Sequence, residues 1–109
     1  MNIKKLKDWV YVFMGPTKVK AMNYNVSSYG IKHVAEQMLG EYVSNVEMKI
    51  AMETYFKEKH YVGDRYEFPT EAARNSPTVN MCYNISSSKY SQVKMLAIRM
   101  KATNMRVEI

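Results

Sequence analysis

The chain has 109 residues, of which 47% are hydrophobic and 24% are charged, and its formal net charge is +6. This is the composition of an ordinary globular domain, which excludes collagen-like, coiled-coil and wholly disordered chains. No apolar run reaches the roughly 18 uncharged residues of a membrane span, and Met1 to Val12 holds three lysines where a signal peptide has an apolar block. We therefore expect one compact domain over residues 1–109, in the cytosol and not in a membrane.

The N-terminal segment fits two patterns. A helical stripe runs through Ile3, Leu6, Val10, Phe13 and Met14, whereas residues 9–14 form a β-branched and aromatic run that is typical of a strand. After Gly15-Pro16 the sequence alternates from Lys18 to Val26, with Met22, Tyr24 and Val26 on one side. We favour a β-hairpin in which residues 9–14 pair with residues 19–26.

Two helices are expected next. Ser27 or Ser28 can cap a helix over residues 29–39, and Gly40 ends it in the usual C-terminal position. The second helix covers residues 45–59 and begins with the capping box formed by Ser44 and Glu47. Apolar residues at three- and four-residue steps predict the buried faces: Ile31, Val34, Ala35, Met38 and Tyr42, then Met48, Ala51, Met52, Tyr55 and Phe56.

The C-terminal half combines a loop, a strand and a helix. Glycine, proline and asparagine interrupt residues 60–80, where only residues 70–74 indicate a short helical turn. Alternation over 78–86 predicts a strand, serines 86–88 can cap a helix over 90–102, and the tail 105–109 is compatible with an edge strand. The expected buried side of that helix is Tyr90, Val93, Leu96, Ala97 and Met100. The fold class is α+β, with a small antiparallel sheet (the N-terminal hairpin plus the strand near 78–86) packed with two or three helices.

Charge is distributed in blocks along the chain. Residues 1–34 carry a net charge of +5, residues 35–71 carry −4 and residues 72–109 carry +5. We expect folding to bring the two basic ends onto one positive surface, with the acidic middle elsewhere.

Cations are interleaved with aromatic residues outside the acidic middle. Lysines can track a phosphate backbone while exposed tyrosines stack on bases. Tyrosine is also a favoured anchor of protein interfaces, so the same residues fit a protein partner. The candidate residues for binding a nucleic acid or another partner are Lys18, Lys20, Tyr24, Tyr29, Lys32, His33, Lys89, Tyr90, Lys94, Arg99 and Lys101.

Signatures of catalysis are few. The chain has no Gly-rich phosphate loop, paired-histidine metal motif or nucleophile elbow, and a zinc site from His33, His60 and Cys82 lacks close ligand spacing. A metal-dependent nuclease could use Glu53, Asp64 or Glu67 with Lys57, a set that any acid-rich helix offers. We expect no enzymatic activity, no cofactor and no bound metal.

A DNA-binding helix-turn-helix is a further alternative, formed by residues 29–39 and 45–59. The second helix would be the recognition helix, yet its three glutamates balance its three lysines. Carboxylates brought toward phosphates offset what the lysines gain, so pairing of the two helices in the core is the preferred interpretation.

Short motifs at residues 28–45 and 80–86 carry a family resemblance. They are Ser28-Tyr29-Gly30-Ile31-Lys32-His33, then Tyr42-Val43-Ser44-Asn45, and Tyr83-Asn84-Ile85-Ser86. This pattern resembles a family of small uncharacterised proteins of phages, plasmids and other mobile elements. The resemblance implies a role in regulating transcription or blocking host defence, with the shared residues Tyr29, Lys32, His33, Tyr42, Asn45 and Asn84 gathered where the first of the two helices meets the strand of Asn84.

The sequence thus predicts a non-enzymatic accessory protein of phage or mobile-element type. It is expected to bind a host nucleoprotein complex or nucleic acid through its basic N- and C-terminal segments, in the host cytosol, and to inhibit host defence. A helix-turn-helix transcription regulator and a small metal-dependent nuclease remain the alternatives. The oligomeric state stays open, a homodimer included.

Overall fold

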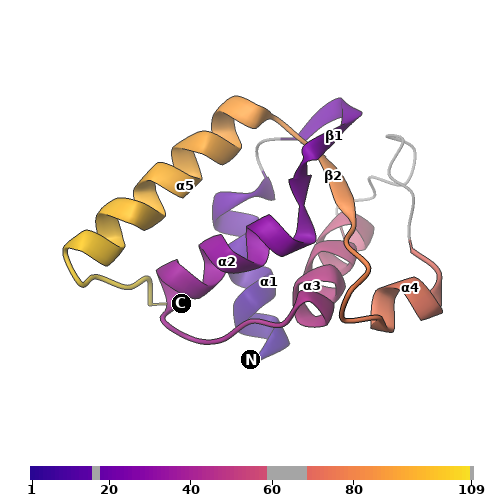
Figure 1. Cartoon of the computed structure of the whole chain (residues 1–109), viewed down its shortest axis with the longest axis horizontal. Helices are drawn as coiled ribbons and strands as arrows, with labels where there is room; N and C mark the ends of the chain where they lie inside the picture. Colours follow the sequence, from indigo (N-terminus) through magenta and orange to yellow (C-terminus); the bar gives the residue numbers. More distant parts are fainter. Residues whose placement is uncertain (16–17, 59–68, 109) are drawn as a thin grey trace.

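Five helices and a two-stranded antiparallel sheet make up the described part of the chain (Figure 1). The computed structural model describes residues 1–15, 18–58 and 69–108, with the backbone alone for residues 18–21. In chain order the elements are α1 (Ile3–Phe13), β1 (Lys18–Ser27), α2 (Ser28–Leu39), α3 (Asn45–Glu58), α4 (Glu71–Asn75), β2 (Cys82–Ile85) and α5 (Ser87–Ala102). The predicted α+β class with a small antiparallel sheet is confirmed.

The predicted N-terminal hairpin is wrong, because residues 9–14 belong largely to helix α1. The side chain of Asn2 caps this helix by accepting hydrogen bonds from the backbone amides of Lys4 and Lys5. Leu6, Trp9 and Val10 are fully buried. These positions are three and four residues apart, so a helix places all of them against the core, whereas a strand would turn Val10 away from Trp9.

Strand β1 pairs instead with the distant strand β2. The register joins Lys18 to Ile85, Asn23 to Tyr83 and Ser27 to Cys82, with irregularities between these pairs. The irregularities break the predicted alternation: Val26 is fully buried while Tyr24 is 81% exposed. Strand β2 also covers less than the predicted 78–86, since Val79 and Asn80 are bonded by side chains of α3 and Met81 is bonded by Ser28 of α2.

The predicted helices at 29–39 and 45–59 are confirmed as α2 and α3, although residue 59 lies outside the described residues. Ser27 caps α2 through a hydrogen bond to the amide of Gly30, and Gly40 ends it with a φ of 71°, a left-handed conformation that favours glycine. The capping box of α3 is formed as expected, with Ser44 and Glu47 each accepting from the other's backbone amide at 3.0 and 2.9 Å.

The C-terminal elements differ from the predictions in three ways. Helix α5 begins at Ser87, because Ser86 caps it. Leu96 is 41% exposed and does not join the buried side. Residues 105–108 form no strand; instead, the amide of Val107 donates a 2.7 Å hydrogen bond to the carbonyl of Met38 and ties the tail to the end of α2.

Helix α2 is central to the packing. It lies against both α3 and α5, and α1 in turn packs against α3. The ring of Phe56 on α3 stacks on Tyr83 of β2, with centroids 6.1 Å apart. Figure 1 shows that α5 runs along one side of the molecule and that α4 lies near the opposite end. Within the described ranges, none of these helices is both long and apolar enough to cross a bilayer.

Two buried polar side chains of α3 hold the segment that precedes β2. Lys49 is 1% exposed, and its ammonium donates to the carbonyl oxygens of Ala73, Ser76 and Val79 at 2.6, 2.7 and 2.7 Å. The side-chain amide of Asn45 donates to the same segment. Burial lowers the pKa of Lys49, an effect that the three carbonyl groups oppose by hydrogen-bonding the charged form.

The Lys49 contacts lead to a stability prediction. Lys49→Met removes three charge-assisted hydrogen bonds and leaves their carbonyl acceptors without that donor, which we expect to destabilise the protein by about 2–3 kcal/mol. Lys101→Met, at an exposed position, is the matched control and should change stability by less than about 0.5 kcal/mol. Urea unfolding at neutral pH measures both, and equal losses in the two variants would contradict the anchoring role of Lys49.

Candidate nucleic-acid interface

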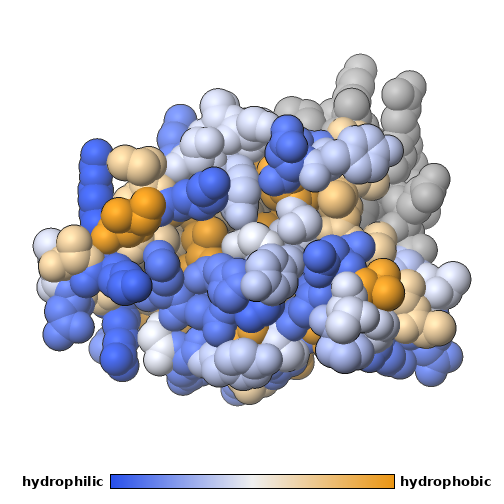
Figure 2. Space-filling model, viewed as in Figure 1, coloured by the Kyte–Doolittle hydropathy of each residue, from blue (hydrophilic) through white to orange (hydrophobic). Residues whose placement is uncertain are grey.

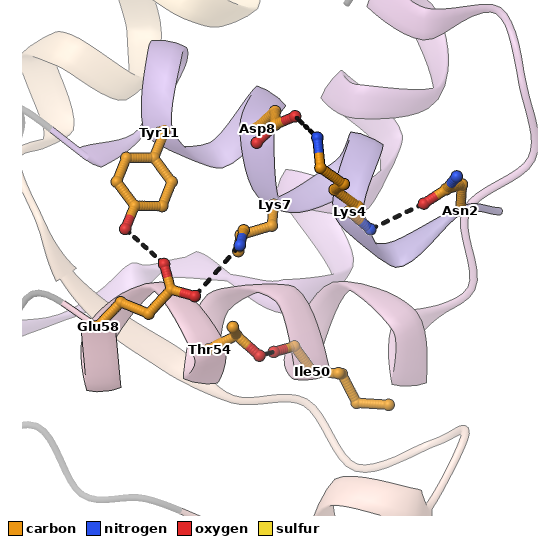
Figure 3. Close-up of polar contacts among 8 residues, drawn as sticks. All are labelled: Asn2, Lys4, Lys7, Asp8, Tyr11, Ile50, Thr54 and Glu58. Carbon is orange, nitrogen blue, oxygen red and sulfur yellow. Dashed lines mark hydrogen bonds and ion pairs between the residues drawn. The ribbon is translucent and has the colours of Figure 1, made fainter.

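The N-terminal lysines on α1 are neutralised by carboxylates. Lys5 lies 3.2 Å from Glu41, and Lys7 lies 3.1 Å from Glu58, which also accepts a hydrogen bond from Tyr11. Lys4 pairs with Asp8 one turn later on the same helix. Figure 3 shows the Lys4 and Lys7 pairs, the second of which joins α1 to α3. These lysines contribute to the packing of α1 rather than to a free positive surface.

The cations of α5 and the tail have no such partners among the described residues, whereas Arg74, earlier in the basic C-terminal block, pairs with Glu53. Sequence positions 72–107 contain no aspartate or glutamate. Among the described residues, no carboxylate lies within 4.0 Å of the charged groups of Lys89, Lys94, Arg99, Lys101 or Arg106. The expected positive surface shared by both chain ends is therefore wrong for α1, and the unpaired cations of the described part lie on α5 and the tail.

The exposed face of α2 carries aromatic rings arranged around one buried lysine. Lys32 is 7% exposed; its ammonium lies 3.0 Å from Glu36 and donates to the carbonyl of Val43 at 3.1 Å. The same ammonium lies over the rings of Tyr29 and Tyr42, at 5.6 and 5.2 Å from their centroids. Lys32 is thus not the surface cation that the sequence predicted. It fixes two tyrosines that are themselves 52% and 71% exposed.

His33 extends this aromatic face toward α5. Its ring contacts Tyr29 edge-on, with centroids 4.5 Å apart, and its Nδ1 lies 3.0 Å from Glu36. Four of the six residues expected to gather, Tyr29, Lys32, His33 and Tyr42, lie together around Lys32 and Glu36, while their expected place beside Asn84 stays a prediction. Asn45 does not join them, because its amide binds the segment before β2.

A groove of about 230 Å³ separates α2 from α5. Val34, Tyr90 and Ile98 supply apolar surface, and His33, Gln37 and Lys94 supply polar groups. The ammonium of Lys94 lies 5.0 Å from the centre of the Tyr90 ring. No acidic side chain lines this groove.

The width of the groove depends on a close approach between Gly30 and Tyr90. A Cβ atom at position 30 would lie 2.5 Å from the Tyr90 hydroxyl, so only glycine allows the tyrosine to reach this depth. The Tyr90 side chain is consequently buried, and burial raises the pKa of its phenol, which stays protonated at neutral pH.

The outer face of α5 mixes apolar and basic side chains. Met95, Leu96 and Ile98 are 51%, 41% and 53% exposed. Lys94, Ile98 and Lys101 follow one side of the helix at four- and three-residue steps, next to α2, whereas Arg99 lies beside Met95 and Leu96 on the other side. Figure 2 shows apolar atoms of α5 among hydrophilic ones on this part of the surface.

The structure brings together only part of the predicted binding set. Tyr29, His33, Tyr90 and Lys94 meet at or beside the groove, with Arg99 and Lys101 farther along α5 and Lys89, half-buried, near its start. Tyr24 is exposed on β1, and the side chains of Lys18 and Lys20 lie outside the described part. Sequence reasoning missed Gln37 and Ile98, although each lies four residues after a predicted site residue and so on the same helix face.

The residues of the catalytic alternatives are placed less favourably. Glu53 is buried and hydrogen-bonds both Arg74 and Lys57. Burial acts to raise the pKa of Glu53, but these two cations outweigh it and hold the pKa below its usual range. His60, Asp64 and Glu67 lie outside the described residues. In the rest of the chain no group of three His, Cys, Asp or Glu side chains could hold a metal ion.

Helix α3 is poorly exposed for a recognition helix. Its buried positions include Lys49 and both aromatic residues, and Lys57 is paired with Glu53. A helix that reads the major groove must present a free polar face. Helix α3 instead packs against α1, α2 and α4, and Lys57 and Glu58 at its exposed end are held in ion pairs.

Comparisons of this chain with protein-family models, with curated proteins and with solved structures find no match. The site is therefore interpreted from its own geometry.

The contact between Gly30 and Tyr90 gives a double-mutant prediction. Gly30→Ala should destabilise the protein by about 1–3 kcal/mol, because the added methyl group overpacks against the phenol oxygen. In a Tyr90→Phe background the nearest atom is the ring carbon at 3.6 Å, an ordinary contact, so the same change should be neutral or stabilising. Thermal and urea unfolding of the four proteins measure the coupling. An equal cost of Gly30→Ala in both backgrounds would show that the hydroxyl does not set the spacing.

Proposed function

We propose that this protein is a non-enzymatic nucleic-acid-binding protein. Its contact surface is the cationic helix α5 together with an aromatic face formed by Tyr29 and His33 of α2 and by Tyr42 just after that helix. The observation that carries the proposal is the difference in pairing between the two basic ends of the chain. Lysines on α1 are matched by carboxylates, and the cations of α5 and the tail have no carboxylate partner among the residues that the structure describes.

Unpaired cations favour a polyanionic partner for a physical reason. A lysine already held by a carboxylate must lose that contact before it can bind a phosphate, so its net contribution is small. Lys94, Arg99 and Lys101 have no such contact to lose within the described residues, and each phosphate they neutralise releases condensed counterions. Of the surface that the structure describes, helix α5 is thus the part on which we expect a phosphate backbone to gain most.

Exposed aromatic rings next to these cations favour a nucleic acid over other polyanions. Tyr29 and His33 adjoin the groove that Lys94 borders, and Tyr42 continues the same face across Lys32. Rings fixed in this way lose little conformational freedom when a base stacks on them, at about 1–3 kcal/mol per stacked base. Cations and rings in one surface are the combination found in proteins that bind single strands.

The biological setting follows from the motif resemblance alone. If the chain is an accessory protein of a phage or mobile element, its target in the host cytosol is a nucleic acid or a host nucleoprotein complex, and inhibition of host defence is the role we propose. The helix-turn-helix and nuclease alternatives gain no support from the placement of α3 and Glu53, so no second function is advanced.

Neutralising the α5 cations should weaken binding to nucleic acid. We expect the triple variant Lys94→Gln, Arg99→Gln, Lys101→Gln to lose about tenfold or more in affinity for a single-stranded oligonucleotide at about 50 mM salt. The slope of log affinity against log salt should also become shallower, by roughly 0.7 for each phosphate contact removed. Fluorescence anisotropy over a salt series measures both quantities.

The matched control removes the same charge from α1. Lys4→Gln, Lys5→Gln, Lys7→Gln breaks only surface ion pairs, each worth about 0–1 kcal/mol, and should alter affinity by less than about threefold. Equal losses in the two triple variants would mean that net charge alone drives binding and would overturn the assignment of α5.

A further inference from the structure

We infer that the groove between α2 and α5 takes one unstacked base of a single-stranded nucleic acid, with the adjoining phosphate on Lys94. The inference rests on the proposed function and deepens it, since it predicts a preference for single strands and for bases over phosphates alone.

The walls of the groove suit a flat, weakly polar group. Val34 and the Tyr90 ring form one part of the lining, and Ile98, 53% exposed on α5, faces the same space. An isoleucine exposed to this degree beside a groove gains when a ring covers it. Gly30 adds no side chain, and the Tyr90 hydroxyl takes the place where a Cβ atom would lie, so the phenol can form a wall of the groove.

The rim offers the groups that the edge and backbone of a nucleotide need. The amide of Gln37 can both donate and accept, and no described residue hydrogen-bonds it. His33, which lines the groove, has Nδ1 3.0 Å from Glu36, so its Nε2 is the ring nitrogen left for a ligand. The Lys94 ammonium is at the same rim without a carboxylate within ion-pairing distance among the described residues.

The size of the groove limits its occupant. About 230 Å³ is below the roughly 300–1,000 Å³ of pockets that enclose drug-sized ligands, so the groove holds one ring system rather than a whole nucleotide. A base in an intact duplex is stacked and paired and must be extruded to enter such a space, which disfavours a duplex. The exposed ring of Tyr29, in contact with His33, is placed to stack on a neighbouring base.

The test measures the affinity of the protein for three probes of equal length. The probes are an oligothymidylate of about 12 nucleotides, an abasic strand with the same phosphates, and a duplex. Wild type should bind the oligothymidylate about tenfold more tightly than the abasic strand, and more tightly than the duplex. The double variant Gln37→Ala, Ile98→Ala should lose about tenfold for the oligothymidylate and less than about twofold for the abasic strand.

The matched control is Val12→Ala, Asn25→Ala, which removes an aliphatic and an amide side chain from exposed positions of α1 and β1, outside both the groove and α5. It should change binding of each probe by less than about twofold. Equal binding of the oligothymidylate and the abasic strand, or equal losses in the two double variants, would overturn the base-binding groove while leaving the proposed function intact. Absence of binding to every probe would overturn both.

A peptide probe tests whether the groove binds a side chain of a protein partner instead of a base. A peptide of alternating leucine and glutamate residues is titrated in the same way. If that peptide binds wild type and loses affinity with Gln37→Ala, Ile98→Ala while the oligothymidylate does not, the groove accepts an apolar side chain and the inference is wrong. No groove-dependent binding of the peptide, together with the losses stated above, supports the base.

Discussion

The phenol of Tyr90 lies directly over Gly30, and the arrangement of the proposed interface depends on this contact. It sets the separation of α2 and α5, because no side chain at position 30 intervenes. Tyr90 becomes the buried wall of the groove, and Lys94, one turn later, reaches its rim. A side chain at position 30 would meet the Tyr90 hydroxyl, so the phenol would have to move from its place as the wall of the groove. The packing of two helices thus fixes the spacing of groups that come from different parts of the sequence.

Folding uses the two basic ends of the chain in different ways. Lys5 and Lys7 join α1 to distant carboxylates, and Lys32 is buried as a support for two tyrosines. Lys49, from the middle of the chain, also has a structural role. Its ammonium donates hydrogen bonds to backbone carbonyls of the segment before β2, which have no strand partner there. After these demands are met, the described cations that remain unpaired lie on α5 and the tail. Among the described residues, the cations left without a carboxylate are therefore concentrated on one helix and the tail that follows it.

Sequence signals that act within one turn predicted much of the fold. Contacts between residues far apart in the chain could not be predicted in this way. Caps at Ser27, Ser44 and Ser86 located three helices, because a capping side chain acts within its own turn. The prediction of an N-terminal hairpin was wrong because residues 9–14 fit the pattern of a helix as well as that of a strand. A helix forms because it buries Leu6 and Trp9 on the side of α1 that packs against α3. Counting charge by blocks could not show that Lys7 meets Glu58. For the site, Tyr29, His33 and Lys94 were predicted, whereas Gln37 and Ile98 required the helix pairing to be known.

The most direct test of the account is a map of amide chemical shifts of the whole protein during titration with a single-stranded oligonucleotide. The account predicts that the largest changes fall in residues 29–37 of α2 and 89–101 of α5, with little change over residues 3–13. Changes concentrated on α1, or spread evenly over the described surface, would contradict the claim that unpaired cations beside an aromatic face define where this protein binds.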